Sequence, residues 1–289
     1  MPRTRRRAVM VLALAFVTSP VPSAQGTAPS ATVPFSVYDG GAVVVAVTIG
    51  GAGPFRFLID TGSTRSAITA RLARQLRSPL VALTAVVTPA GDGARSVALI
   101  HGLSVGHARL LSVAAMVVPD GLSPRAGRVD GLLGQDVLAN QSYTIDYQRR
   151  QLTWHAGEVT DFAGHRLPLT EANGLYFVSL PAMAATVRPM RLVVDSGAET
   201  IVLFGGPDGI NPPAAQLGTG LLRTALGTRI GRHIRLDRLD LGGFSMRDQT
   251  ALLMTEPESS GLLGDGLLPL HLFARVTFDG SRTLIVATQ

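Results

Sequence analysis

The sequence contains no cysteine and no lysine, and its apolar runs are short. Without cysteine the chain has no disulfide, no thiol nucleophile, no iron–sulfur cluster and no cysteine-ligated zinc. Its stability must come from core packing, for which 46% hydrophobic and only 16% charged residues supply the material. The six histidines show no metal-ligand spacing. The sequence therefore predicts neither a metal nor a cofactor.

The N-terminus carries the pattern of a targeting segment. Residues 3–7 include four arginines, an apolar run of 10 residues extends from Ala8 to Val17, and Ser23-Ala24-Gln25 offers a cleavage site. The run is too short to cross a bilayer, which takes about 20 residues. We expect residues 1–24 to be a secretory signal peptide, which implies a periplasmic or secreted protein. An uncleaved N-terminal anchor facing the periplasm is the alternative.

The basic charge of the chain is mostly a property of this leader. All 26 basic residues are arginine, and removing the leader's four leaves 22 against 20 acidic residues, a net charge of +2. No basic stripe interleaved with aromatic residues occurs. We therefore expect no nucleic-acid partner and, once the leader is cleaved, no stable membrane insertion. A monomer is expected.

One short motif occurs twice, 135 positions apart. Phe57-Leu58-Ile59-Asp60-Thr61-Gly62-Ser63 recurs as Leu192-Val193-Val194-Asp195-Ser196-Gly197-Ala198. Four blocks repeat in the same order, at offsets between 130 and 136: Gly40–Asp60 on Leu175–Asp195, Leu103–Gly106 on Leu239–Gly242, Gly131–Leu138 on Gly261–Leu268, and Tyr143–Tyr147 on Arg275–Asp279. A unit of this length predicts a duplicated domain and not a solenoid.

Short β-rich segments separated by Gly/Pro turns predict an all-β fold of two similar β-barrel-like lobes with short helices. We expect a flexible segment at 25–34, an N-terminal lobe at 35–155, a linker at 156–167 and a C-terminal lobe at 168–289. Ile68, Leu72 and Leu76 recur every four residues and predict a helix from Ser66 to Arg77. A helical turn is expected from Gln135 to Asn140.

The duplication places Asp60 and Asp195 in equivalent positions, each at the end of an apolar strand. Two carboxyl groups held about 3 Å apart cannot both ionise, so they share one proton. The ionised partner then activates a water as general base, and the protonated one donates to a scissile carbonyl oxygen. Such a pair titrates as one unit. An isolated Asp-Ser-Gly is more often an ordinary turn, and only the duplication reverses that interpretation.

Competing motifs are weaker. Gly102-Leu103-Ser104-Val105-Gly106 fits the elbow of serine hydrolases, but the next segment, Ala108–Val118, reads as a strand and not as the required helix. Gly50-Gly51-Ala52-Gly53 precedes a strand, so it predicts a turn and not a phosphate loop. Asp146 and Asp279 recur in the repeat, at positions where aspartate usually begins a hairpin turn.

With these motifs the sequence resembles the aspartic proteases, specifically the retropepsin-like branch. Asp195-Ser196-Gly197-Ala198-Glu199-Thr200-Ile201 is similar to the active-site motif of retroviral proteases, and Gly131-Leu132-Leu133-Gly134-Gln135-Asp136 to their second signature. Retroviral enzymes pair two identical subunits, whereas this chain resembles a fused pair, as in pepsin. The resemblance covers roughly residues 35–289 and implies the acid protease fold with a pseudo-dyad between the lobes.

The resemblance implies a role for each matching residue. Asp60 and Asp195 are the expected catalytic pair, supported by Thr61, Gly62, Ser63, Ser196 and Gly197. The hydroxyls of Thr61 and Ser196 are each expected to form hydrogen bonds with the other lobe. Ser63 is expected to hydrogen-bond the outer oxygen of Asp60, and Ala198 has no hydroxyl to do the same for Asp195. Ala90, Gly91, Asp92 and Gly93 are the expected flap over the substrate, with a second, shorter flap near Leu226-Gly227-Thr228.

The expected function is that of an exported aspartic endopeptidase acting on polypeptide in extended conformation. The alternative is a catalytically silent, retropepsin-like peptide-binding module.

Overall fold

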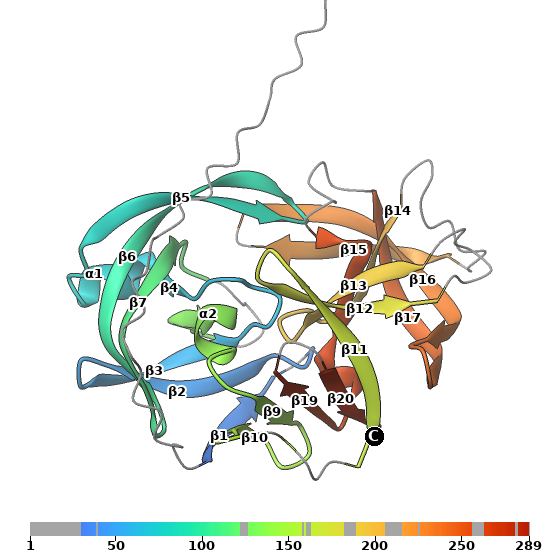
Figure 1. Cartoon of the computed structure of the whole chain (residues 1–289). Coiled ribbons are helices and arrows are strands. Elements are labelled where there is room, and N and C mark those ends of the chain that lie inside the picture. The colour runs from blue at the N-terminus through green and yellow to red at the C-terminus, as the bar shows by residue number, and fades with distance from the viewer. Residues whose placement is uncertain are drawn as a thin grey trace, which may run out of the picture.

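The computed structural model describes residues 30–38, 40–121, 127–157, 159, 163–181, 189–205, 216–224, 226–255, 263–280 and 283–288. The expected leader and parts of the expected linker lie outside these ranges. Within them, no helix combines the length and the apolar composition that a bilayer crossing requires. The described chain is mostly β-structure with a few short helices, as predicted (Figure 1).

The first lobe is a mixed sheet of the seven strands β2 to β8, extended by β1 (Ala31–Val37), which pairs with β2. Its strands follow the sequence closely: the β-branched run from Val43 to Ile49 forms β2, with alternate side chains buried near its end. The elements are β2 (Val43–Ile49), β3 (Ala52–Ile59), β4 (Ala67–Thr69), α1 (Ala70–Gln75), β5 (Leu80–Thr88), β6 (Gly91–Val105), β7 (Ala108–Val118), β8 (Gly131–Leu133) and α2 (Gln135–Leu138).

The second lobe repeats this plan. In both lobes the strand that leads to the aspartate pairs in parallel with a short buried strand, β3 with β8 and β13 with β18. The elements are β12 (Leu175–Leu180), β13 (Met190–Asp195), β14 (Ile201–Gly205), β15 (Gln216–Thr224), β16 (Gly227–Asp240), β17 (Ser245–Thr255), β18 (Gly266–Pro269) and the 3₁₀ helix η1 (Leu270–Leu272).

A third sheet joins the lobes at the bottom of the view in Figure 1. Its strand order is β1 (Ala31–Val37), β10 (Gln151–Trp154), β9 (Tyr143–Asp146), β19 (Arg275–Asp279), β20 (Thr283–Ala287) and β11 (His165–Ala172). The central pair β9–β19 brings together Thr144 and Thr277, whose Oγ1 atoms lie 2.8 Å apart. One hydrophobic core cluster includes residues of both lobes and of this sheet.

The structure corrects three expectations about local structure. Ala31–Val37 forms β1, so residues 31–34 are a strand and not part of a flexible segment. β11 begins at His165, inside the expected linker. The predicted helix from Ser66 to Arg77 is wrong in its first turn: residues 67–69 form β4, and α1 spans only Ala70–Gln75.

The physical reason for the shorter helix is strand pairing. The backbone N–H of Thr69 donates to the carbonyl of Asp130 (2.9 Å), and β4 pairs with both β7 and β8. Thr69 then serves as the N-cap of α1, accepting from the N–H of Leu72. The helical turn expected from Gln135 is present as α2.

The alignment of the repeat also needs one correction. Ile59 pairs with Leu133, and Val194 pairs with Leu268, so the segment matching Gly131–Asp136 is Gly266–His271 at an offset of 135. The expected match on Gly261–Leu268 is therefore displaced by five residues, and Gly261 and Leu262 lie outside the described residues. Parallel pairing beside the aspartate strand, and not similarity of residues, fixes this register.

Candidate active site

The structure brings Asp60 and Asp195 together where the two lobes meet. Asp60 follows β3 and Asp195 ends β13, and their carboxyl groups share a hydrogen bond. The loops approach so closely that only glycine fits opposite each acid. A Cβ on Gly62 would lie 2.4 Å from the Asp195 carboxyl carbon, and a Cβ on Gly197 would lie 2.9 Å from an Asp60 oxygen. The two expected carboxyl groups therefore do form a pair.

Thr61 and Ser196 lock the loops to one another. The Thr61 hydroxyl donates to the carbonyl of Val194 (2.8 Å) and accepts from the N–H of Ser196 (2.9 Å). The Ser196 hydroxyl donates to the carbonyl of Ile59 (2.8 Å) and accepts from the N–H of Thr61 (3.0 Å). Both side chains are almost fully buried. These four reciprocal bonds hold the acids face to face, as expected from the motif.

The two acids differ in how many N–H groups hold them. Asp60 accepts from the N–H of Gly62 (3.1 Å). Asp195 accepts from the N–H of Gly197 (2.7 Å), and the N–H groups of Ala198 and Gly62 also bond to it. Donors of this kind favour the ionised form. The surroundings of Asp195 therefore favour an ionised carboxylate more than those of Asp60 do.

The pKa of each acid is raised in the folded protein. Burial raises the pKa of Asp60 well above its ordinary value, and the neighbouring charge of Asp195 and the bond to it raise it further. Burial also raises the pKa of Asp195, but the N–H groups and the proton donated by Asp60 oppose that rise. The pair is one coupled acid that retains its shared proton to higher pH than an exposed aspartate.

The expected role of Ser63 is wrong. Its hydroxyl donates to the carbonyl of Arg65 (2.7 Å), two residues further on, and not to the outer oxygen of Asp60. A hydroxyl has one proton to donate, so this local turn bond uses it up. The two acids do lie in unlike environments, as expected. However, Asp195 and not Asp60 has the larger number of N–H donors that favour a negative charge.

Each lobe contributes one long hairpin. The first has its tip at Pro89-Ala90 between β5 and β6, so Gly91, Asp92 and Gly93 of the expected flap already belong to β6. The second joins β15 and β16 and pairs over a comparable length, so it is not the shorter flap that was expected. Figure 1 shows the two hairpins reaching toward each other across the top of the molecule.

The hairpin tips touch. Thr88 and Thr224, which end β5 and β15, place their Oγ1 atoms 3.1 Å apart. Arg229 on β16 donates to the carbonyl of Pro89 (2.8 Å) and also bonds Thr255 of its own lobe. A Cβ on Gly93 would lie 3.2 Å from Leu226. Sequence reasoning missed Thr88, Thr224 and Arg229, although the two threonines lie 136 positions apart, within the repeat's range.

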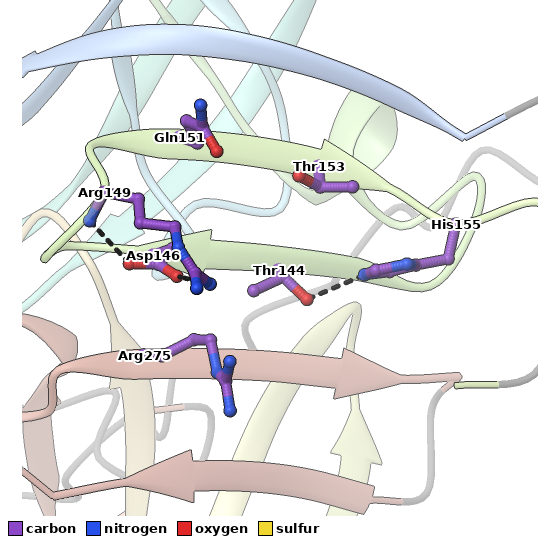
Figure 2. A pocket seen from close by; sticks show the side chains of 7 residues that line it. All are labelled: Thr144, Asp146, Arg149, Gln151, Thr153, His155 and Arg275. Atoms are coloured by element: carbon purple, nitrogen blue, oxygen red, sulfur yellow. Dashed lines mark hydrogen bonds and ion pairs between the residues drawn. The ribbon is translucent and has the colours of Figure 1, made fainter. Parts of the chain in front are cut away.

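A separate small pocket lies on the sheet that joins the lobes (Figure 2). Its volume is about 110 Å³, and it contains neither acid of the pair. Thr144 bonds His155 there (2.7 Å), and Arg149 pairs with Asp146. Asp146 also caps its turn by accepting from the N–H of Arg149 (2.7 Å), the turn role expected from the sequence. Among the described residues, no cluster of three potential ligands could hold a metal.

Comparison with known proteins gives two findings. Residues 45–137 match the family described as aspartyl protease. This range includes Asp60 but not Asp195. The fold is similar to that of conglutin gamma, a basic 7S globulin from lupine seeds, with a TM-score of 0.51 and 12% identity over 90% of this chain and 95% of that one. No curated protein sequence matches. The family match supports a protease of the aspartic class, and the structural likeness shows the fold.

Proposed function

We propose that this protein is an aspartic endopeptidase that hydrolyses peptide bonds with a water held between Asp60 and Asp195. The observation that carries the proposal is the hydrogen-bonded pair of carboxyl groups, presented by matching loops that Thr61 and Ser196 interlock. The family match over residues 45–137 supports it.

In this mechanism each acid has one task. Asp195, held by backbone N–H groups, is the ionised partner and removes a proton from the water. Asp60 carries the shared proton and donates it to the oxygen of the scissile carbonyl as the water attacks its carbon. The tetrahedral intermediate then collapses: Asp195 gives its proton to the nitrogen, which leaves as an amine, and a hydroxyl of the intermediate returns a proton to Asp60 as the new carboxyl group forms. No cofactor is needed for these steps.

The substrate we propose is polypeptide in extended conformation. A strand passing between the acids and the hairpins can form backbone hydrogen bonds with both. We further propose that the chain is exported, because residues 1–24 have the pattern of a signal peptide. The mature protein is proposed to act as a monomer in the periplasm or outside the cell.

The test uses the mature protein and an unstructured protein substrate assayed from acid to neutral pH. We expect cleavage that a statine-type transition-state mimic blocks and that Asp60→Asn and Asp195→Asn each reduce at least about a thousandfold, since either change removes a group that acts on the reacting atoms. Binding of peptide without turnover in the wild type contradicts the proposal and identifies a silent peptide-binding module. Cleavage that survives both changes but is lost in Ser104→Ala identifies a serine hydrolase.

A further inference from the structure

The segment behind the second aspartate loop differs in kind from its counterpart in the first lobe. Counting from the paired residues Leu133 and Leu268, His271 takes the position of Asp136, and Leu270 that of Gln135. The first lobe therefore has an acid and an amide here, and the second has an imidazole and an alkyl group. The two loops cannot be supported by the same bonds.

In the first lobe both side chains fasten the loop. Gln135 donates from its Nε2 to the carbonyl of Thr61 (2.9 Å), next to Asp60. Asp136 accepts from the N–H and the hydroxyl of Ser66 (2.8 and 2.7 Å), and the Ser66 hydroxyl in turn accepts from the N–H of Gly134. Leu270 is fully buried and has no polar atom in its side chain, so the second loop needs another support.

His271 supplies a polar contact to that loop. Its ring bonds the backbone of Ala198, whose own N–H bonds the Asp195 carboxylate. Burial lowers the pKa of His271, so the ring is neutral near pH 7 and keeps one N–H. The bond to the backbone of Ala198 opposes that lowering, which is the effect expected of a carbonyl that accepts the ring N–H.

The ring is also clamped from the other lobe. It lies against the turn that joins β1 to β2, where a Cβ on Gly41 would be 2.2 Å from the His271 Cγ. Gly41 has φ +82°, a conformation that also favours glycine. Next to it, a Cβ on Gly40 would be 2.8 Å from Glu199, which follows Ala198. The imidazole is thus fixed between the first lobe and the Asp195 loop.

We propose that His271 is the positioning residue of Asp195: its ring N–H holds the carbonyl of Ala198 and so aims the N–H of the same residue at the carboxylate. This inference rests on the proposed function. It assigns His271 no contact with the substrate and no proton transfer. Its prediction is a loss that appears in the chemical step and not in peptide binding.

The experiment compares His271→Leu with His271→Gln and His271→Asn. Leucine fills similar space without a donor, whereas the two amides place an N–H near the positions of the two ring nitrogens. We expect Leu to lower kcat about tenfold with KM changed less than about twofold, and to weaken binding of a statine-type mimic by a similar factor. At least one amide variant should recover most of kcat.

The matched control is His155→Leu, which removes another partly buried histidine with a lowered pKa, on the sheet that joins the lobes. We expect its kcat to stay at the wild-type value. Thermal unfolding of all variants shows whether a loss of kcat merely follows a loss of fold. If the folded His271→Leu protein keeps its kcat, or if both amides fail while folded, the inference is wrong. If the wild type cleaves nothing, the proposed function itself has failed.

Discussion

The loop that presents Asp60 and the loop that presents Asp195 follow the same course, but each holds its carboxyl group differently. Gly62 is the one backbone donor to Asp60, whereas three N–H groups reach Asp195. Behind them, Gln135 and Asp136 fasten the first loop, and His271 contacts the second. A duplicated fold thus gives two chemically equal carboxyl groups unequal hydrogen-bonding surroundings, and an acid–base pair requires groups in unlike environments.

The two loops are most alike in the four reciprocal hydrogen bonds of Thr61 and Ser196. Removing these bonds should have the largest effect on stability. Thr61→Val and Ser196→Ala each remove a buried hydroxyl that makes two bonds to the other lobe. We expect each change to lower the free energy of unfolding by about 3 kcal/mol, because the former partners stay buried without a bond. Urea denaturation measures this.

The control is Thr32→Val, which removes one member of an exposed threonine pair and should cost less than about 0.5 kcal/mol. If Thr61→Val and Ser196→Ala each lower the free energy of unfolding by less than about 1 kcal/mol, the four reciprocal bonds do not hold the lobes together.

The pH dependence of stability should separate the two acids. The pKa of Asp60 is raised in the folded protein, so the stability that its proton contributes is fully present below the unfolded pKa of about 3.9 and is lost as pH rises through the folded pKa. The Asp60→Asn variant has no such group and does not lose this stability as pH rises. The difference in Tm between this variant and the wild type should therefore increase, in favour of the variant, by a few degrees from pH 4 to pH 8.

The Tm of Asp195→Asn relative to wild type should increase less over the same pH range, since the N–H groups around Asp195 oppose the rise of its pKa. Differential scanning calorimetry of both variants at each pH makes the comparison. A larger gain for Asp195→Asn than for Asp60→Asn would reverse our assignment of the proton.

The hairpins offer a smaller contrast. Arg229 reaches across to Pro89, whereas the residue 136 positions earlier, in the corresponding place, is Gly93. Arg229→Met should loosen the contact between the tips and raise KM several-fold with little change in kcat. Arg238→Met on the same strand, where the arginine pairs with Asp240 at the surface, should change neither. Equal kinetics for the two variants would show that the bond to Pro89 does not help to hold substrate.

Ser63→Ala should have the smallest effect. The hydroxyl donates to Arg65 and not to Asp60, so kcat/KM should stay within about twofold of wild type across pH. A displaced pH profile would mean that Ser63 turns toward Asp60 when substrate is bound.

Much of the fold could be predicted from the sequence because it depends on local pattern. The strand at Ala108–Val118 has the predicted bounds. The two aspartates were found because the motif is duplicated, and Thr61 and Ser196 follow from the same motif.

What the sequence could not provide depends on contacts between distant segments. The helix at Ser66–Arg77 loses its first turn because β4 finds partners in β7 and β8. The second signature was misplaced because Gly261-Leu262-Leu263-Gly264 repeats the residues of Gly131–Gly134, whereas strand register selects Gly266 onward. The contact of His271 with the backbone of Ala198 depends on that register.

The central claim is that Asp60 and Asp195 hold one proton between them and that it resides on Asp60. Carbon-13 NMR of aspartate-labelled protein, with Asp60→Asn and Asp195→Asn to assign the two carboxyl signals, tests it directly. We predict two coupled steps seen by both carboxyl carbons, with the step of higher pKa well above 3.8 and reported mainly by Asp60. Two independent titrations, each near the ordinary aspartate value and each unaltered by replacing the other residue, would contradict the account.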